Sequence, residues 1–228
     1  DEQDTLVSRG SALSPTHISP PKMIMTVTKM LGFLAAADAL QLTPMAGRAT
    51  TRMSSPEMKV GLIYSTTTGN TETVAGYVAA EIGATEVDIA DVSTDDIMAF
   101  DGLICGAPTW HTGADTERSG TAWDEFLYGD LASMDLAGKK VAVFGLGDQA
   151  GYGDNFCDAM DELTACFKAQ GAEIVGSWST DGYDHDESKS VDGGKFVGLP
   201  CDEDNQPEMS EERVKAWVAQ LKGEGMPF

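Results

Sequence analysis

The chain has 228 residues, enough for one domain of ordinary size or two small ones, and its hydrophobic content of 42% can supply a sizeable core. Its 37 acidic and 15 basic residues give a net charge of −22, which argues against nucleic acid or an anionic membrane as a partner and favours a basic protein partner or simple solubility. The four cysteines form no CxxC pair and the three histidines are scattered, so the sequence predicts reduced thiols and no metal site.

Residues 1–56 differ in composition from the rest of the chain and predict a targeting leader. Residues 1–22 are interpreted as sequence upstream of a start at Met23 or Met25, and residues 23–40 contain the short apolar run MLGFLAAADAL, which is typical of a signal peptide. Residues 41–56 contain arginines and hydroxyl side chains but no acid, like a transit peptide. This order resembles the leaders of proteins sent to plastids bounded by extra membranes. It predicts the plastid stroma, and an unstructured tail on a cytoplasmic protein is the alternative.

Residues 57–228 predict a single α/β domain, because short apolar runs alternate with segments of helical periodicity. In chain order we predict a strand at 59–65, a helix at 71–82, a strand at 85–91, a weaker helix at 94–100, a strand at 102–108, a helix at 121–131, a strand at 139–145, a helix at 156–170, a strand at 173–180 and a helix at 210–222. Near-continuous apolar strands predict a five-stranded, doubly wound parallel sheet covered on both faces.

The last strand is predicted to be interrupted by an insertion. A polar, glycine-rich segment, DGYDHDESKSVDGGK at 181–195, follows the strand at 173–180, and the apolar residues 196–199 then read as strand again. A loop of this length is usually functional or disordered.

Three loops follow predicted strands, where ligands of such sheets bind. The first connects a strand to a helix and is rich in hydroxyl groups, which together with free backbone N–H groups would form a phosphate cradle without a cation. It lacks the spacing and the lysine of a P-loop. A threonine-rich helix cap is the alternative interpretation. Its residues are Ser65, Thr66, Thr67, Thr68, Gly69, Asn70 and Thr71.

The second and third loops each present an aromatic residue, Trp110 and Tyr152, just past a strand end. Core or surface packing explains either aromatic alone, but two of them beside a phosphate cradle predict a flat ring held between them, as in flavin mononucleotide (FMN). The candidate residues of the second loop are Pro108, Thr109, Trp110, His111, Thr112 and Gly113. Those of the third are Gly145, Leu146, Gly147, Asp148, Tyr152, Asn155 and Phe156.

The motifs STTTGNT, APTWHTG, GLGDQAGYGDNFCDAM and DGYDHDESKSVDGGKFVGLPCDEDNQ resemble those of long-chain flavodoxins, in particular plastid-targeted algal ones. The resemblance implies strand order 2-1-3-4-5 and one bound FMN. It places the FMN phosphate on residues 66–71, Trp110 on the inner flavin face and Tyr152 on the outer face. It places the pyrimidine edge on Gly147 and Asp148, and it gives the His111 carbonyl the role of accepting a hydrogen bond from flavin N5.

The resemblance further implies a monomeric one-electron carrier without catalytic residues or membrane insertion. Its expected partners are photosystem I and ferredoxin–NADP reductase, between which it would replace ferredoxin when iron is scarce. Two alternatives share the fold. An NAD(P)H quinone reductase needs room for a nicotinamide over the flavin ring, which Tyr152 would cover. A non-redox signalling domain needs an acidic cluster at the strand ends, where this chain has Ser and Thr.

Overall fold

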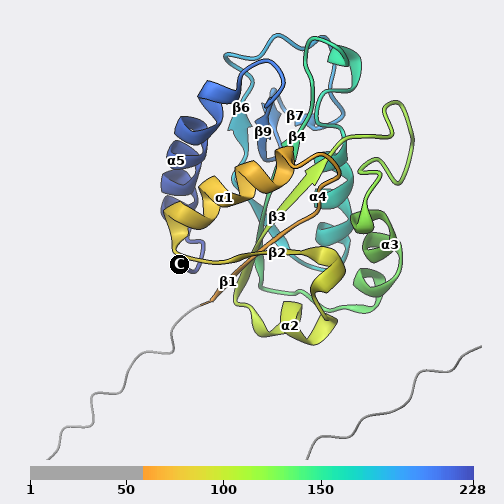
Figure 1. The fold of residues 1–228 in the computed structure, drawn as a ribbon. Helices are drawn as coiled ribbons and strands as arrows, with labels where there is room; N and C mark the ends of the chain where they lie inside the picture. Colours follow the sequence, from red (N-terminus) through yellow and green to blue (C-terminus); the bar gives the residue numbers. More distant parts are fainter. Residues whose placement is uncertain (1–58) are drawn as a thin grey trace, which may run out of the picture. The chain divides into compact units, whose positions relative to one another are not determined.

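The structure is a computed structural model that describes residues 59–228, and the leader predicted over residues 1–56 lies outside the described residues. Strands and helices alternate along this part of the chain (Figure 1). In chain order the elements are β1 (Val60–Tyr64), α1 (Asn70–Ile82), β2 (Glu86–Asp88), η1 (Ile89–Asp91), α2 (Thr94–Ala99), β3 (Gly102–Pro108), α3 (Ala122–Tyr128), η2 (Asp130–Ser133), β4 (Lys140–Leu146), η3 (Gly153–Asn155), α4 (Ala159–Ala169), β5 (Glu173–Val175), β6 (Trp178–Ser179), β7 (Val191–Asp192), β8 (Lys195–Phe196), β9 (Leu199–Cys201) and α5 (Pro207–Gly223).

The main sheet is parallel and has the order β2-β1-β3-β4-β5, which confirms the predicted doubly wound fold. Neighbouring residues of a strand contribute to different hydrophobic clusters. In β3, Leu103 and Cys105 belong to one cluster, and Ile104 belongs to the other. Successive side chains of a strand point to opposite faces of a sheet, so both faces are buried. This explains why the strands read as near-continuous apolar runs.

Helices cover both faces of the sheet (Figure 1). Helices α1 and α5 contribute to one hydrophobic cluster and helices α3 and α4 to the other. Each layer contains a fully buried tryptophan whose indole N–H is satisfied. Trp123 of α3 donates to the Gly106 carbonyl at 2.8 Å, and Trp217 of α5 donates to the Gly176 carbonyl at 2.7 Å. Among residues 59–228, no helix has both the length and the hydropathy that crossing a bilayer requires.

The interruption of the last strand is confirmed, but it is longer than the predicted 181–195. Strands β5 and β9 pair with successive parts of β4 as two pieces of one edge strand, and the chain between them leaves the sheet. This segment forms a small antiparallel sheet in the order β6-β8-β7. The prediction that residues 176–180 and 196–198 belong to the main sheet is therefore wrong.

Two glycines flank this interruption and explain its bounds. Gly176 has a positive φ of 86°, and a Cβ there would come within 2.7 Å of the Trp217 ring. At Gly198 a Cβ would overlap the carbonyl oxygen of Val143. The chain therefore departs and returns at points where only glycine fits against the neighbouring elements.

Two other predicted elements end earlier than the sequence pattern suggests. The strand predicted over 85–91 ends at Asp88, because the Asp88 carboxylate accepts from Ala90 N at 2.9 Å and turns the chain into η1. The helix predicted over 121–131 ends at Tyr128 and is followed by η2. Both differences arise from local turns that interrupt a periodic pattern.

The last two helices also differ at their N-termini. The helix predicted over 156–170 begins at Ala159, because Cys157 adopts a left-handed φ of 55° that a continuous helix cannot contain. The helix predicted over 210–222 begins earlier, at Pro207, which occupies the first helical position. Proline is favoured there because its missing N–H would have no partner within the helix.

Candidate functional site

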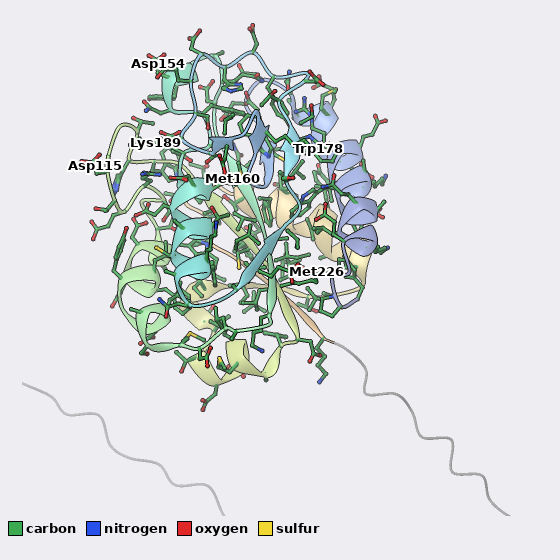
Figure 2. The ribbon with its side chains drawn as sticks, turned by 180° about the vertical axis from the view of Figure 1, so that it is seen from behind. Asp115, Asp154, Met160, Trp178, Lys189 and Met226 are labelled. Carbon is green, nitrogen blue, oxygen red and sulfur yellow. The ribbon has the colours of Figure 1, made fainter. Side chains whose placement is uncertain are left out.

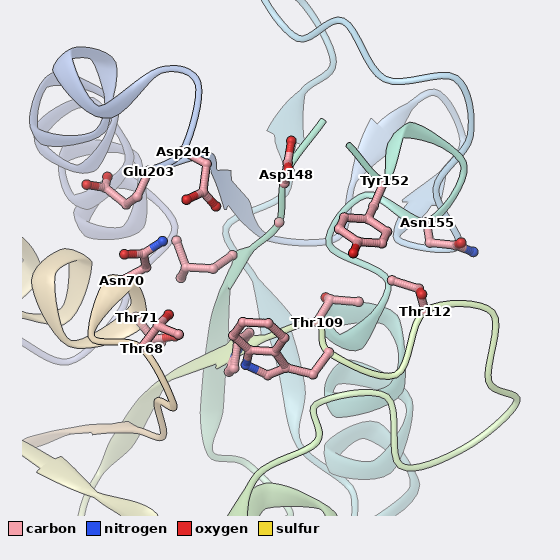
Figure 3. A pocket seen from close by; sticks show the side chains of 14 residues that line it. Thr68, Asn70, Thr71, Thr109, Thr112, Asp148, Tyr152, Asn155, Glu203 and Asp204 are labelled. Carbon is pink, nitrogen blue, oxygen red and sulfur yellow. The ribbon is translucent and has the colours of Figure 1, made fainter. Parts of the chain in front are cut away.

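A cavity of about 360 Å³ opens at the carboxyl ends of β1, β3 and β4 (Figure 3). This volume lies within the range of about 300–1,000 Å³ that is typical of small-molecule sites. Residues from all three predicted loops line it, together with two residues from the segment after β9. The lining residues are Thr68, Asn70, Thr71, Pro108, Thr109, Trp110, Thr112, Leu146, Gly147, Asp148, Tyr152, Asn155, Glu203 and Asp204.

The first loop leads into the N-terminus of α1, which no side chain caps. Gly69 starts the helix with a left-handed φ of 96°, and its N–H donates to Thr66 Oγ1 at 3.0 Å. The next backbone N–H groups have no partner within the helix, because their acceptors would have to precede it. Thr71 is 1% exposed, and its Oγ1 is buried without a hydrogen-bond partner. This end of the cavity therefore offers unpaired polar groups that suit an anion.

The second loop carries Trp110 at the rim of the cavity with 48% of its surface exposed. The N–H groups of Trp110 and His111 both donate to the Arg118 carbonyl, at 3.1 and 3.2 Å. The His111 imidazole turns toward the loop, where its Nδ1 lies 2.6 Å from the Glu117 carbonyl oxygen. The His111 carbonyl, the group expected to meet flavin N5, accepts a hydrogen bond from Ala114 N at 3.2 Å.

The third loop presents Tyr152, which is 58% exposed, on the side of the cavity across from Asn70 and Thr71 (Figure 3). The Asp148 carboxylate shapes this loop by accepting hydrogen bonds from Gly151 N at 2.7 Å, Ala150 N at 3.0 Å and Asn205 Nδ2 at 2.8 Å. These donors lower the pKa of Asp148, the Gly151 N–H most strongly. The side chain is thus engaged within the protein, and both Gly147 and Asp148 line the cavity.

Two lining residues were not predicted from the sequence, Glu203 and Asp204. They lie in the segment after β9, which β9 brings beside the third loop by pairing with β4. Burial is the main cause that raises the pKa of Glu203, and the nearby Asp202 and Asp204 carboxylates act in the same direction. The Glu203 Oε1 atom is buried and has no hydrogen-bond partner. The acidic run after β9 was visible in the sequence, but it has no spacing that assigns it to a site.

Several predicted residues lie off the cavity lining. The side chain of Phe156 is fully buried and packs against Phe196, with ring centroids 6.0 Å apart. At Gly145 a Cβ would overlap Met160, so this glycine allows α4 to approach β4. The other predicted residues outside the lining lie in the first and second loops. They are Ser65, Thr66, Thr67, Gly69, His111 and Gly113. The cofactor-binding roles of the candidate residues stay predictions.

The lining fits a ligand with an anionic group at one end and a flat ring at the other. The buried, unpartnered Thr71 hydroxyl and the open end of α1 suit the anion. Trp110 and Tyr152 offer exposed aromatic faces, and exposed aromatic side chains at a cavity rim are typical of a ligand-binding groove. FMN has this combination of a phosphate and an aromatic ring system.

The known proteins that are similar in sequence to this chain include flavodoxins. The flavodoxin of a Picosynechococcus species is 49% identical over 168 residues, which are 72% of this chain and 96% of the relative. The flavodoxin of a Synechocystis species shows the same identity over the same coverage. Flavodoxin 1 of Escherichia coli is 40% identical over 168 residues and 93% of its own length.

A solved structure of Fusobacterium nucleatum flavodoxin bound to flavin mononucleotide superposes with a TM-score of 0.67 at 32% sequence identity, covering 73% of this chain and 99% of that one. The family model described as flavodoxin matches residues 62–217. Fold, motifs and relatives agree, and so the chain belongs to the flavodoxin family of electron-transfer flavoproteins.

Proposed function

We propose that this flavodoxin binds one FMN in the cavity and carries single electrons between protein partners. The observation that carries the proposal is that one cavity combines the buried, unpartnered Thr71 hydroxyl with the exposed rings of Trp110 and Tyr152. FMN is also the ligand named for the Fusobacterium nucleatum flavodoxin. FMN would supply the one-electron chemistry, because amino-acid side chains do not provide it at low potential.

The residues of this chain then have distinct roles. Thr68, Asn70 and Thr71, at the open end of α1, would hold the phosphate through hydroxyl and backbone N–H groups. Trp110 and Tyr152 would cover the two faces of the ring and exclude water from them. The backbone of Gly147 and Asp148 would meet the polar edge of the ring.

Acidic residues around the cavity would make the bound flavin a weak acceptor of further negative charge. Asp148, Glu203 and Asp204 line the cavity, and among residues 59–228 no lysine or arginine lines it. Two like charges about 4 Å apart cost on the order of 4 kcal/mol at an effective dielectric constant near 20. These carboxylates would therefore lower the midpoint potential of the flavin, as a carrier of low-potential electrons requires.

We further propose a location and partners. The composition of residues 1–56 and the similarity to cyanobacterial flavodoxins favour the plastid stroma as the location. Photosystem I would then be the electron donor and ferredoxin–NADP reductase the acceptor, with a role when iron is scarce. The net charge of −22 favours partners with basic docking surfaces.

The FMN proposal is tested by titrating the purified, flavin-free chain with FMN and following the quenching of flavin fluorescence. We expect a yellow complex with one FMN per chain. Trp110→Ala and Tyr152→Ala should each weaken binding roughly tenfold, the order of an aromatic contact. The exposed Phe228 does not line the cavity, so Phe228→Ala is the control and should bind like the unmodified chain. A chain that takes up no FMN would refute the proposal, and steady NADPH oxidation without a reductase would favour a quinone reductase.

A further inference from the structure

The loop that carries Trp110, residues 109–120, has few contacts with the hydrophobic core. Most of its residues are exposed from Trp110 to Glu117, so burial alone does not hold the loop in one conformation. We call this segment the tryptophan loop. Polar contacts with helix α4 replace the missing core contacts, and one carboxylate in that helix is central to them.

Glu162 of α4 is only 5% exposed and faces the tryptophan loop. One carboxylate oxygen accepts from Glu117 N at 2.6 Å and the other accepts from Arg118 N at 2.8 Å. The Tyr128 hydroxyl donates to the same carboxylate. Two successive backbone N–H groups that converge on an anion form a strong, directional binding arrangement. The Glu162 carboxylate therefore holds two successive N–H groups of the loop and also binds one hydroxyl group of α3.

Glu117 supports this interpretation through its backbone. Its φ of 57° lies in the left-handed region, which is unfavourable for a residue with a Cβ. This conformation points the N–H groups of Glu117 and Arg118 toward the same carboxylate. A strained backbone of this kind persists only where its surroundings stabilise it. Here the buried Glu162 carboxylate accepts from the Glu117 N–H, and the His111 imidazole contacts the Glu117 carbonyl.

The Arg118 side chain adds a second set of contacts. Its Nη1 forms an ion pair with Asp161 Oδ2 at 2.8 Å and donates to the Asp158 carbonyl at 3.1 Å, both from the start of α4. Its Nε donates to the Ala114 carbonyl at 3.2 Å. The insertion also contacts the tryptophan loop, because Lys189 Nζ donates to the same Ala114 carbonyl at 2.9 Å. Figure 2 shows Lys189 beside the loop that carries Asp115.

These contacts reach Trp110 through one backbone group. The Arg118 carbonyl accepts the N–H groups of both Trp110 and His111, so the residue that Glu162 and Asp161 hold in place in turn holds Trp110. Gly120 lies under Trp110, where an added Cβ would come within 2.7 Å of the Trp110 Cβ. The position of the tryptophan at the cavity rim is thus set by residues that do not line the cavity.

We propose that Glu162 and Arg118 are positioning residues that hold Trp110 at the cavity rim before the ligand binds. The inference rests on the proposed FMN site for its functional consequence. A loop held in its binding conformation loses less entropy when the ligand arrives, so the contacts increase affinity without touching the ligand. Loss of the Glu162 carboxylate would free the loop and weaken ligand binding.

The test is Glu162→Gln, which keeps the size of the side chain but leaves one backbone N–H without an acceptor. In the flavin-free chain, hydrogen exchange at the Trp110 and His111 amides should become at least about tenfold faster, while exchange in β3 stays unchanged. Binding of FMN should weaken about 3- to 10-fold.

Glu173→Gln on β5 is the matched control, because it removes the same charge from an exposed ion pair with Lys140 on β4. Removal of an acid reduces repulsion of the FMN phosphate, so its electrostatic effect is tighter binding, opposite to the effect of a freed loop. Weaker binding in Glu162→Gln together with unchanged or tighter binding in Glu173→Gln therefore identifies a positioning effect.

A second variant covers the case in which Glu162→Gln does not fold. Asp161 has a 38% exposed side chain, and Asp161→Asn weakens only its ion pair with Arg118. It should change exchange and affinity in the same direction by about threefold. The inference is overturned if the folded variants match Glu173→Gln in both measurements. Failure of the unmodified chain to bind FMN would refute the proposed function instead, while amide exchange would still decide whether these residues hold the loop.

Discussion

At the scale of single residues, the site depends on side chains that shape loops as much as on those that face the cavity. Asp148 lines the cavity, yet its carboxylate accepts three hydrogen bonds from within the protein. Glu162 lies outside the lining and holds the tryptophan loop through two backbone N–H groups. In both cases a carboxylate satisfies backbone donors of a loop that has no regular secondary structure to pair with.

The lowered pKa of Asp148 predicts a pH-dependent contribution to stability. Its carboxylate binds protons less readily in the folded state than in the unfolded state, so the contribution is present above a pH of about 4 and is lost as the pH falls through the folded-state pKa. Asp148→Asn should lower the free energy of unfolding by about 1 kcal/mol at pH 7, with the difference shrinking below pH 4. Urea unfolding of both chains across pH 2–7 measures this difference in the free energy of unfolding.

The control for this prediction is Asp154→Asn, at an exposed acid close by in the third loop. It removes the same charge but should not reproduce the pH-dependent loss. A difference between Asp148→Asn and the unmodified chain that stays constant from pH 7 to pH 2 would contradict the role assigned to the carboxylate.

At the scale of elements, the split edge strand connects the insertion to the site. Strand β9 pairs with β4 beyond the end of β5, and it leads directly into Glu203 and Asp204 at the cavity. Gly147 N donates to the Cys201 carbonyl at 3.2 Å, which ties the end of β9 to the third loop. The return of the chain to the sheet after the insertion therefore builds one wall of the cavity.

Gly198→Ala tests this arrangement. A Cβ at Gly198 would overlap the Val143 carbonyl oxygen, so β9 would have to separate from β4. We expect a loss of about 2 kcal/mol in the free energy of unfolding, measured in urea, and weaker FMN binding. Gly76→Ala is the matched control, because it lies inside α1 with nothing within 4 Å of the added Cβ. It should leave binding unchanged and stabilise the chain slightly. Equal stability of the two variants would show that β9 tolerates the shift.

At the scale of the whole molecule, the acidic charge belongs mainly to the described domain. Residues 1–56 contain four acids and five bases, so residues 57–228 hold 33 acids and 10 bases and carry a net charge of −23. Exposed acids lie on the two loops that carry the aromatic residues, among them Asp115 and Asp154. Such a field would guide the cavity edge toward a basic partner and would act mainly on the rate of association.

This steering predicts a salt dependence. Electron transfer to ferredoxin–NADP reductase should slow steeply as salt rises from 0.1 M to 1 M, because the Debye length falls from about 10 Å to about 3 Å. Neutralising Asp115 and Asp154 together should slow the reaction at low salt and flatten its salt dependence. The control is Asp95→Asn on α2, which removes charge from an exposed position away from the cavity. If the rate of electron transfer changes neither with salt nor with these substitutions, the acidic surface charge serves solubility and not steering.

The sequence by itself determined the strand–helix alternation, the parallel sheet and the three loops of the cavity. It could do so because apolar periodicity and turn residues are local properties, and because the carboxyl ends of parallel strands meet at one edge of the sheet. Thr71, Trp110 and Tyr152 were therefore predicted to lie together, and all three line the cavity.

Only the tertiary structure decided the features that depend on contacts between distant residues. The true limits of the interruption follow from Gly176 against Trp217 and Gly198 against Val143. Glu203 reaches the cavity because β9 pairs with β4. Glu162 occupies a helical position that reads as ordinary. Its role depends on hydrogen bonds to Glu117 and Arg118, which lie 45 and 44 residues earlier in the chain. Such pairs leave no local pattern, because burial and hydrogen bonding across the fold are set by packing and not by neighbours in the chain.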